Sequence, residues 1–435
     1  MTTLLERAKG SALDIVIERN SSNTITLLLP HVQRIKHLTF PLNYQSQIFT
    51  DSQVISGPLP LLRTLKISAN YSDDPQSRPN TFAALPPLLF RGAVNLEEFD
   101  FELDSAGSLK SFVFPNLITF KLLTAPLVNF NASDLLDFLK ASPMLQTVEV
   151  RIDWDMVLED IPRELVVLPN VKTFSLSVSG AEQQVYEPAV HISCPHATYT
   201  SLEQHIFDNH MTFDVEAFPR PGSCKTIVYH YSAGPVDEVT LEIGGCQFPL
   251  VATYSLTFKS SDAAVVRFGF ELGASLEDLH MSHGEMDLEI FSQACWTIRN
   301  HPLLSHVNRL HIKDGSGSFG TDYGMRMADV LWDLLESLGP LDQLTFDGFG
   351  LQRLLPESSH VERVFPPVRE LTISEECMFD DERRGVDAIV ELAVSQHNLE
   401  KPFERIRIYA RDCPMFIEVW LRQWVGAVDF YELRS

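Results

Sequence analysis

One spacing of apolar and polar positions recurs along most of the chain and predicts a series of short strands. Each copy reads apolar, polar, polar, apolar, any residue, apolar, as in Ile-Lys-His-Leu-Thr-Phe at 35–40. Further copies begin at Leu62, Leu96, Leu117, Leu145, Val171, Leu276, Val307, Leu341, Val368 and Phe403. Successive side chains of a strand point to opposite faces, so the last two apolar positions of each copy predict one buried face.

Two further regularities support the strand prediction. Proline has no N–H and suits the residue before a strand, and it stands two residues ahead of five copies, as Pro60, Pro115, Pro143, Pro169 and Pro366. The fourth position of successive copies holds Leu38, Leu65, Phe99, Phe120, Val148, Phe174, Leu279, Leu310, Leu344, Leu371 and Ile406. Most intervals lie in or somewhat above the period of about 20–29 residues that is typical of leucine-rich repeats.

A first strand is expected within 12–20, where Ala12, Ile15 and Ile17 occupy the apolar positions. Asn20, Asn43 and Asn70 follow the early strands, where asparagine side chains can form a hydrogen-bond ladder in regular repeats. Later copies hold other residues at this position, which indicates degenerate repeats.

Helices are expected between the strands. The clearest spans 325–338, where one apolar stripe ends at Gly339 and Pro340. Ser133 is expected to cap a helix over 134–140, and further helices are predicted at 287–300, 385–397 and 414–425. Alternating strands and helices indicate parallel strands with right-handed crossovers. The expected fold class is therefore α/β: an irregular leucine-rich-repeat solenoid, in which a curved parallel sheet carries helices or loops on its outer face.

We expect residues 1–435 to form a single solenoid, within which 181–260 interrupts the repeat. Stretches from Cys224 and from Val236 fit the strand pattern loosely, and 189–192 and 253–258 alternate like strands. Two interpretations of this irregular strand-rich segment remain open: repeats without proper helices, or an inserted β subdomain. Residues 414–435 are expected to cap the C-terminal end, with Phe416, Val419, Trp420 and Trp424 on one face of the helix.

The net charge argues against several classes of partner, and the cysteines indicate the cellular compartment. The chain carries 34 Lys and Arg against 58 Asp and Glu, a net charge of −24, which argues against non-specific binding to nucleic acid or anionic membranes. No run approaches the roughly 20 apolar residues of a membrane span. Six scattered cysteines without a C-x-x-C pair, together with an N-terminus charged too early for a signal peptide, indicate a cytoplasmic or nuclear protein.

The candidate chemical motifs do not favour an enzyme. His191, Cys194 and His196, with His205 and His210 nearby, form the densest group of possible metal ligands, but no second cluster follows at zinc-finger spacing. The acidic loop at 375–382 lacks the calcium-loop pattern, and the glycines at 315–324 do not match a phosphate loop. No G-x-S-x-G nucleophile elbow occurs. We therefore expect no catalytic residues, no metal and no cofactor.

The polar positions that alternate with the buried ones predict a protein-binding surface on the concave side of the sheet. Its expected residues are Lys66, Glu98, Asp100, Lys121, Glu149, His280, Arg309, His311, Lys313, Arg405, Arg407 and Tyr409. This surface is expected to be acidic near Glu98 and basic near Arg309 and Arg405. Complementary charge of this kind can set partner choice and association rate.

The Pro-x-Leu-polar-polar-Leu-x-Leu strands, the degenerate helices and the opening Gly-Ser-Ala-Leu-Asp-Ile at 10–15 resemble the repeat region of fungal F-box-like proteins, over about residues 5–435. The resemblance implies a non-catalytic interaction module, like the substrate-recognition region of an F-box adaptor of a cullin ubiquitin ligase. In that family an F-box precedes the repeats and docks on a Skp-type linker.

Nine residues before Gly10 leave no room for an F-box, so a Skp-type linker is expected as a partner only if an F-box lies upstream. The second hypothesis, after the interaction module of an F-box adaptor, is a stand-alone repeat scaffold that binds an unidentified protein and has no ubiquitin-ligase link. An enzyme with its site within 181–260 is the third hypothesis, which no catalytic constellation supports.

Overall fold

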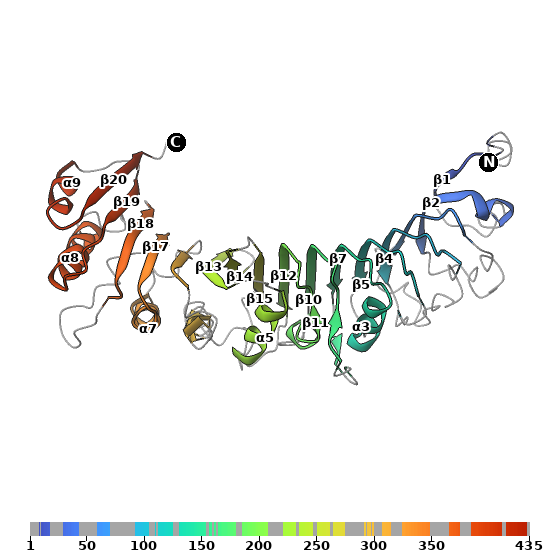
Figure 1. Cartoon of the computed structure of the whole chain (residues 1–435), viewed down its shortest axis with the longest axis horizontal. Coiled ribbons are helices and arrows are strands. Elements are labelled where there is room, and N and C mark those ends of the chain that lie inside the picture. The colour runs from blue at the N-terminus through green and yellow to red at the C-terminus, as the bar shows by residue number, and fades with distance from the viewer. Residues whose placement is uncertain are drawn as a thin grey trace. The chain divides into compact units, whose positions relative to one another are not determined.

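The computed structural model is a mixed α/β fold dominated by a large, mostly parallel sheet that does not close on itself (Figure 1). The structure describes residues 8, 10–17, 29–42, 59–69, 92–103, 109, 112–124, 130–153, 156–158, 161, 164–179, 185–207, 221–231, 235–246, 250–261, 264–274, 291–292, 294–296, 298–299, 307–314, 324–348, 365–374, 384–410 and 415–432. The chain divides into two compact units, Met1–Gln204 and His205–Ser435.

Strands of the first unit lie side by side in sequence order. They are β1 (Leu13–Val16), β2 (Ile35–Leu42), β3 (Thr64–Ala69), β4 (Glu98–Leu103), β5 (Thr119–Thr124), β7 (Thr147–Ile152), β10 (Thr173–Ser179) and β12 (Tyr199–Phe207). The pairs from β1 to β10 are parallel. Two short parallel pairs join β6 (Phe130–Asn131) to β8 (Met156–Val157) and β9 (Val166–Val167) to β11 (Ile192–Ser193). The helical elements are η1 (Leu29–Arg34), α3 (Ala132–Lys140) and α4 (Tyr186–Ala189).

The second unit combines an antiparallel meander with a parallel sheet. Its elements are α5 (Pro221–Tyr231), β13 (Val236–Cys246), β14 (Leu250–Ser260), β15 (Val265–Ala274), β16 (Arg309–Asp314), α7 (Gly324–Ser337), β17 (Leu341–Asp347), β18 (Val368–Ser374), α8 (Arg384–Asn398), β19 (Arg405–Ala410), α9 (Met415–Leu421) and β20 (Ala427–Glu432). The spatial order is β15-β14-β13-β16-β17-β18-β19-β20. Pairs among β13, β14 and β15 are antiparallel, and those from β13 through β16 to β20 are parallel.

The strand register is the one that the repeat predicts. In the first unit Leu38 lies opposite Leu65, which lies opposite Phe99, and the series continues through Phe120, Val148 and Phe174. In the second unit the same position runs through Val239, Leu310, Leu344, Leu371 and Ile406. All of these side chains are buried, so the apolar column of each unit is continuous. The copy that begins at Leu276, with Leu279, lies outside the described residues.

A four-residue turn leads into each of β3, β4, β5, β7, β10 and β12, and we call it the leading turn. The N–H of its fourth residue donates to the carbonyl of its first, at 3.0–3.4 Å. The first residue is always buried: Leu59, Ala93, Phe114, Ser142, Leu168 and Cys194. Proline fills the second position of five of these six turns, as Pro60, Pro115, Pro143, Pro169 and Pro195, because its fixed φ suits that position of a β-turn.

Asparagines at the third position connect consecutive leading turns. The side-chain amide of Asn95 donates to the carbonyl of Pro60 at 2.7 Å, and that of Asn116 donates to Val94 at 2.9 Å. Asn170 donates likewise to Pro143 at 3.0 Å. An asparagine ladder therefore exists at a position that the sequence analysis missed, whereas Asn20, Asn43 and Asn70 lie outside the described residues.

Phenylalanines fill the centre of the first unit's core. Phe99 is fully buried. Its ring centroid lies 5.2–6.4 Å from the centroids of Phe101, Phe112, Phe114, Phe120 and Phe138. These rings come from β4, β5, α3 and the segment between β4 and β5, so one side chain holds several elements together.

A buried amide on β12 lies at the end of the first unit. Gln204 is fully buried, and its Oε1 accepts a hydrogen bond from the N–H of Val185 at 3.2 Å. Its Nε2 donates to the carbonyl of Val178 at 3.3 Å. The side chain thus satisfies two backbone groups that precede α4 and lie on β10, as buried polar groups require.

Several predicted helices are confirmed. Helix α7 (Gly324–Ser337) and helix α8 (Arg384–Asn398) match the expected spans within a residue or two, and the described residues within 291–299 are helical. The cap of α3 was wrongly assigned: Asn131, not Ser133, is the N-cap, and its Oδ1 accepts from the N–H of Ser133 at 2.8 Å. Both residues are good caps, and the one that precedes the first helical φ/ψ takes the position.

The prediction for 181–260 was wrong where it placed strands instead of helices. The stretch from Cys224 lies in α5, and 189–192 holds the end of α4 and the start of β11. Ile227, Val228 and Tyr231 are buried at a spacing that also fits a helical face, which explains the ambiguity. The strands expected from Val236 and over 253–258 are confirmed as β13 and β14.

One further repeat was missed at 197–202, Ala-Thr-Tyr-Thr-Ser-Leu, which follows the leading turn of β12. Thr200 occupies the position that apolar residues hold in other copies and is fully buried, as is Leu202. The Thr200 hydroxyl has no hydrogen-bond partner among the described residues. A buried hydroxyl without a partner costs stability.

Replacing Thr200 with valine is therefore expected to stabilise the first unit by about 0.5–1.5 kcal/mol, because valine keeps the shape and removes the buried hydroxyl. Hydrogen exchange of the β10 and β12 amides measures the effect. Thr147→Val, at a half-buried position on the polar side of β7, is the matched control. Faster exchange in Thr200→Val than in the unaltered protein would show that the hydroxyl is satisfied.

The expected C-terminal helix is shorter than predicted and presents another face. Helix α9 ends at Leu421, and β20 follows it as the last strand of the second unit. Ile417 and Leu421 are buried, whereas Val419 and Trp420 are 63% and 51% exposed, so the predicted stripe was wrong. Apolar residues on both sides of a short helix leave its inner face undecided by sequence alone.

A candidate protein-binding face

Charged side chains of opposite sign alternate on the solvent side of the first unit's sheet. Strand pairing places Lys66, Asp100, Lys121 and Glu149 side by side on β3, β4, β5 and β7. Lys66 Nζ lies 3.0 Å from Glu98 Oε1 and 3.9 Å from Asp100 Oδ2. Lys121 Nζ lies 2.6 Å from Glu149 Oε2. The structure therefore brings together all five residues that the sequence predicted for this unit.

The electrostatics of this row centre on Asp100, which is flanked by two lysines. Burial raises the pKa of the Asp100 carboxyl, while the charges of Lys66 and Lys121 act in the opposite direction. The hydrogen bond to Glu149 raises the pKa of Lys121. Each cation on this row is shared with a carboxylate on an adjacent strand, so the row is a cross-strand network of ion pairs.

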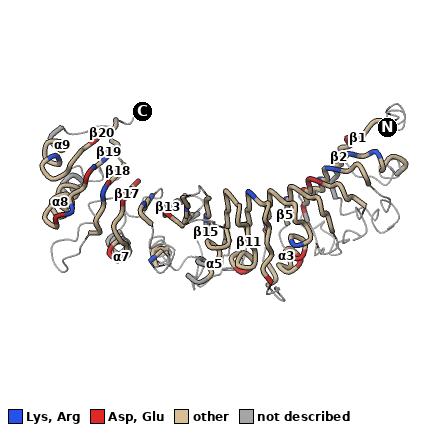
Figure 2. The backbone as a smooth tube through the Cα atoms, viewed as in Figure 1, with Lys and Arg blue, Asp and Glu red and all other residues tan. Residues whose placement is uncertain are grey.

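The second unit carries a matching network on β13 and β16. Arg309 Nη2 lies 2.9 Å from Asp237 Oδ2, and Arg309 Nη1 lies 3.2 Å from Glu238 Oε2. Lys313 Nζ lies 2.6 Å from Glu242 Oε1. Figure 2 shows such acidic and basic positions on neighbouring strands of each unit.

A second group on this unit lies on β18, β19 and β20. Arg407 Nη2 is 3.0 Å from Glu370 Oε2, and Arg405 Nε is 3.2 Å from Asp429 Oδ2. Beside them the rings of Tyr409 and Tyr431 stack with centroids 4.7 Å apart. Together the outward residues of β3, β4, β5 and β7 and of β13 and β16–β20 form what we call the polar faces of the two units.

The sign predicted for the second polar face was wrong. Arg309 and Arg405 do not lie in basic patches, because acids on adjacent strands neutralise them. The acids on β13 were missed because this strand belongs to the irregular segment, which the repeat could not align with β16. For the last three strands the signal was the register, which places Glu370 opposite Arg405 and Asp429 opposite Arg407.

One of the two histidines predicted for this face lies among the described residues. His311 lies on β16 between Thr240 and Thr345 and is half-buried. Burial lowers the pKa of its imidazole, although the carboxylate of Asp347 acts in the opposite direction. His280, the other predicted histidine, lies outside the described residues.

The possible metal ligands at 191–196 do not converge, because the leading turn of β12 separates them. Cys194 is the buried first residue of that turn, and His196 is its exposed third residue. Burial raises the pKa of the Cys194 thiol well above its usual range. Across the described part of the chain, no group of three or more His, Cys, Asp or Glu side chains is placed to hold a metal ion. The acidic loop at 375–382 lies outside the described residues.

Comparison with known proteins gives no relative: no family model, curated protein or solved structure matches the chain. Within its described residues, no helix has the length and apolar character needed to cross a membrane.

Proposed function

We propose that this chain is a non-catalytic protein–protein interaction module of the cytoplasm or nucleus, and that it binds its partner on the polar faces. We also propose that its fold is an irregular leucine-rich-repeat solenoid, like the substrate-recognition region of an F-box adaptor of a cullin ubiquitin ligase. A stand-alone scaffold that binds an unidentified protein is the alternative, and a Skp-type linker is a partner only if an F-box accompanies the repeats.

The observation that carries the proposal is the column of aligned ionic side chains on one side of each sheet. In-register parallel strands present Lys66, Asp100, Lys121 and Glu149 on four consecutive strands of the sheet. The residues that alternate with them along each strand are buried. Such a surface is held rigidly by the sheet beneath it. Rigid, patterned charge favours selective binding of a protein surface with the complementary pattern.

The stacked tyrosines give the second polar face a different character. Tyr431 is 43% exposed and stacks on Tyr409, next to the Arg405–Asp429 pair. Tyrosine and arginine are the residue types that most often dominate binding energy at protein interfaces. We therefore propose this end of the second unit as the strongest contact for a protein partner.

Paired charge reversals test the proposal. The immobilised chain is incubated with cell extract, and the retained proteins are quantified for the wild type, for Lys66→Glu/Lys121→Glu and for Arg405→Glu/Arg407→Glu. We expect at least one pair to reduce retention of a specific protein about tenfold or more, since like charges across an interface cost over about 1.4 kcal/mol.

Lys140→Glu is the control. Lys140 is exposed, lies on α3 away from the strands of the sheet, and pairs with Glu164 through an Nζ–Oε2 distance of 2.5 Å. It reverses one charge in the same direction, where each face variant reverses two, and should leave retention unchanged. Circular dichroism confirms that each variant is folded. Equal retention of every protein by the wild type and both face variants would exclude the polar faces as the binding site.

A further inference from the structure

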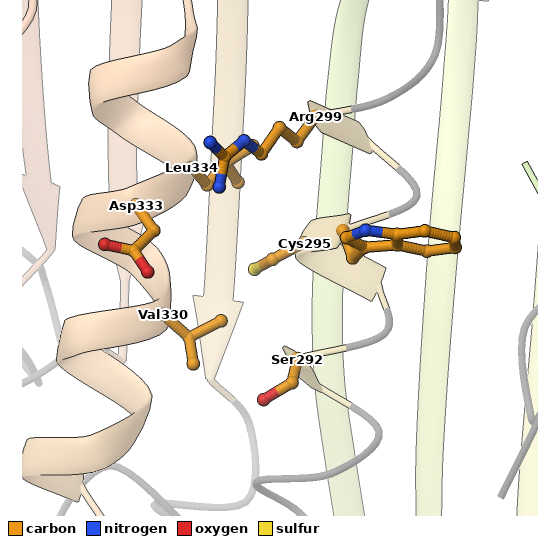
Figure 3. A pocket seen from close by; sticks show the side chains of 7 residues that line it. Ser292, Cys295, Arg299, Val330, Asp333 and Leu334 are labelled. Carbon is orange, nitrogen blue, oxygen red and sulfur yellow. The ribbon is translucent and has the colours of Figure 1, made fainter.

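A small cavity lies in the second unit between the helical residues of 291–299 and helix α7, away from the charged rows described above. Its volume is about 140 Å³. Figure 3 shows the side chains that line it from the two sides. They include Ser292, Cys295 and Arg299 from one segment and Val330, Asp333 and Leu334 from α7.

The spacing of these residues explains the cavity. Ser292, Cys295 and Arg299 recur at three- and four-residue intervals, which places them on one side of a helical segment. On α7, Asp333 and Leu334 stand three and four residues after Val330, which also places the three on one side of the helix. Two helical faces with short side chains at their centres leave a groove between them, which larger side chains would have filled.

The groove has an apolar floor. Cys295 and Leu334 are buried, and Val330 is half-buried. Burial raises the pKa of the Cys295 thiol well above its usual value, so the sulfur is a neutral, weakly polar surface. A volume of about 140 Å³ equals about four to five water molecules in the liquid, which suits the four carbons of a leucine side chain.

The rim carries one acid, Asp333, and one cation, Arg299, and the cation is available to a ligand. Arg299 is exposed, and within the described part of the chain its guanidinium has no hydrogen bond or ion pair. In Figure 3 the side chain reaches across the groove toward Leu334 of α7. Guanidinium groups pair with carboxylates through two parallel hydrogen bonds, and such pairing adds both affinity and orientation.

We propose that this groove binds a short segment of a partner protein that presents one aliphatic side chain beside a carboxylate. The aliphatic group occupies the floor formed by Cys295, Val330 and Leu334, and the carboxylate pairs with Arg299. The site is separate from the polar faces and does not depend on the proposed function. It is a second, peptide-sized docking position on the helical side of the second unit.

Saturation-transfer NMR on the full chain tests this proposal with three acetylated and amidated pentapeptides, Ala-Ala-Leu-Glu-Ala, Ala-Ala-Leu-Lys-Ala and Ala-Ala-Ala-Glu-Ala. We expect the strongest saturation at the leucine methyl groups of the first peptide. Replacing its glutamate by lysine should weaken binding about threefold to tenfold, because an exposed ion pair, which is weak, is replaced by a repulsion of similar size. The peptide without leucine should bind more weakly still.

Arg299→Glu should reverse the preference, so that the lysine peptide binds better than the glutamate peptide. Lys401→Glu makes the same charge change at an exposed position outside the groove and should leave the preference as it is. If Arg299→Glu fails to fold, Arg299→Gln serves instead and should abolish the difference between the two peptides. Absence of leucine saturation at millimolar peptide, or equal binding of both charged peptides to the wild type, would overturn the proposal.

Discussion

Replacement of Phe99 by alanine is expected to destabilise the first unit by about 3–5 kcal/mol, the cost typical of removing a buried phenylalanine. Phe99 is fully buried and lies against five other phenylalanine rings, so its loss opens a cavity that several elements border. The measurement is hydrogen exchange of the β4, β5 and β7 amides under native conditions, which reports the opening free energy of that unit.

Val113→Ala supplies the control for this substitution. Val113 is 58% exposed and lies one residue from two members of the phenylalanine cluster. Its truncation should change the opening free energy by no more than about 0.5 kcal/mol. A loss below about 1 kcal/mol in Phe99→Ala would show that the surrounding rings collapse into the space, and the packing described for this core would be wrong.

The second large effect is expected from Gln204→Leu, which we predict to destabilise the end of the first unit by about 2–6 kcal/mol. The substitution leaves the Val185 N–H and the Val178 carbonyl buried without their partner, and each such group costs about 1–3 kcal/mol. The loss should appear as faster amide exchange in β10, α4 and β12, with β3 to β5 less affected, because the two orphaned groups belong to the former elements.

Gln423→Leu makes the same chemical change at an exposed position in the second unit and is expected to be nearly neutral. Gln204→Glu adds a further check, because the carboxylate form keeps an acceptor for Val185 and loses the donor to Val178. If Gln204→Leu were as stable as the wild type, the two backbone groups would be satisfied by other partners.

The strand register was predictable because one face of each strand is buried. A slip of one residue at Leu65 or Phe99 would turn every apolar side chain to the solvent, so a period of two fixes the pairing once the strands are identified. The same reasoning failed at Thr200, whose side chain has the shape of valine but counts as polar in a pattern of residue classes. Burial of that residue depends on its neighbours, which a local pattern does not include.

For the candidate site, the sequence predicted which residues of a strand point outward but not which strands are neighbours. The sequence identified Arg309 and Arg405 as outward residues, but their acidic partners depend on which strands are neighbours. In the second unit β13 lies next to β16 although β14 and β15 intervene in the chain, because two antiparallel connections reverse the order. Glu238 therefore lies beside Arg309, an arrangement that a strictly sequential array would not produce.

The side chains of the groove were missed for a related reason. Cys295 and Leu334 look like ordinary core positions of two amphipathic helices, and only the packing of one helix beside the other leaves a space between them. Arg299 carries no pattern that separates it from other surface arginines. Helical periodicity predicts which residues share one face of a helix. It does not predict which two helices pack side by side, and a site between helices depends on that packing.

The leading turns of the first unit also bear on how such a chain can change its length during evolution. Each turn has a buried first residue, three of the six described turns also have an asparagine link to the preceding turn, and each begins the next strand at the same register as the last. Duplication or deletion of a segment from one leading turn to the next would therefore preserve the alignment of every remaining strand. The order of charges across the sheet could then be rewritten by gain or loss of whole segments, without any point substitution in the core.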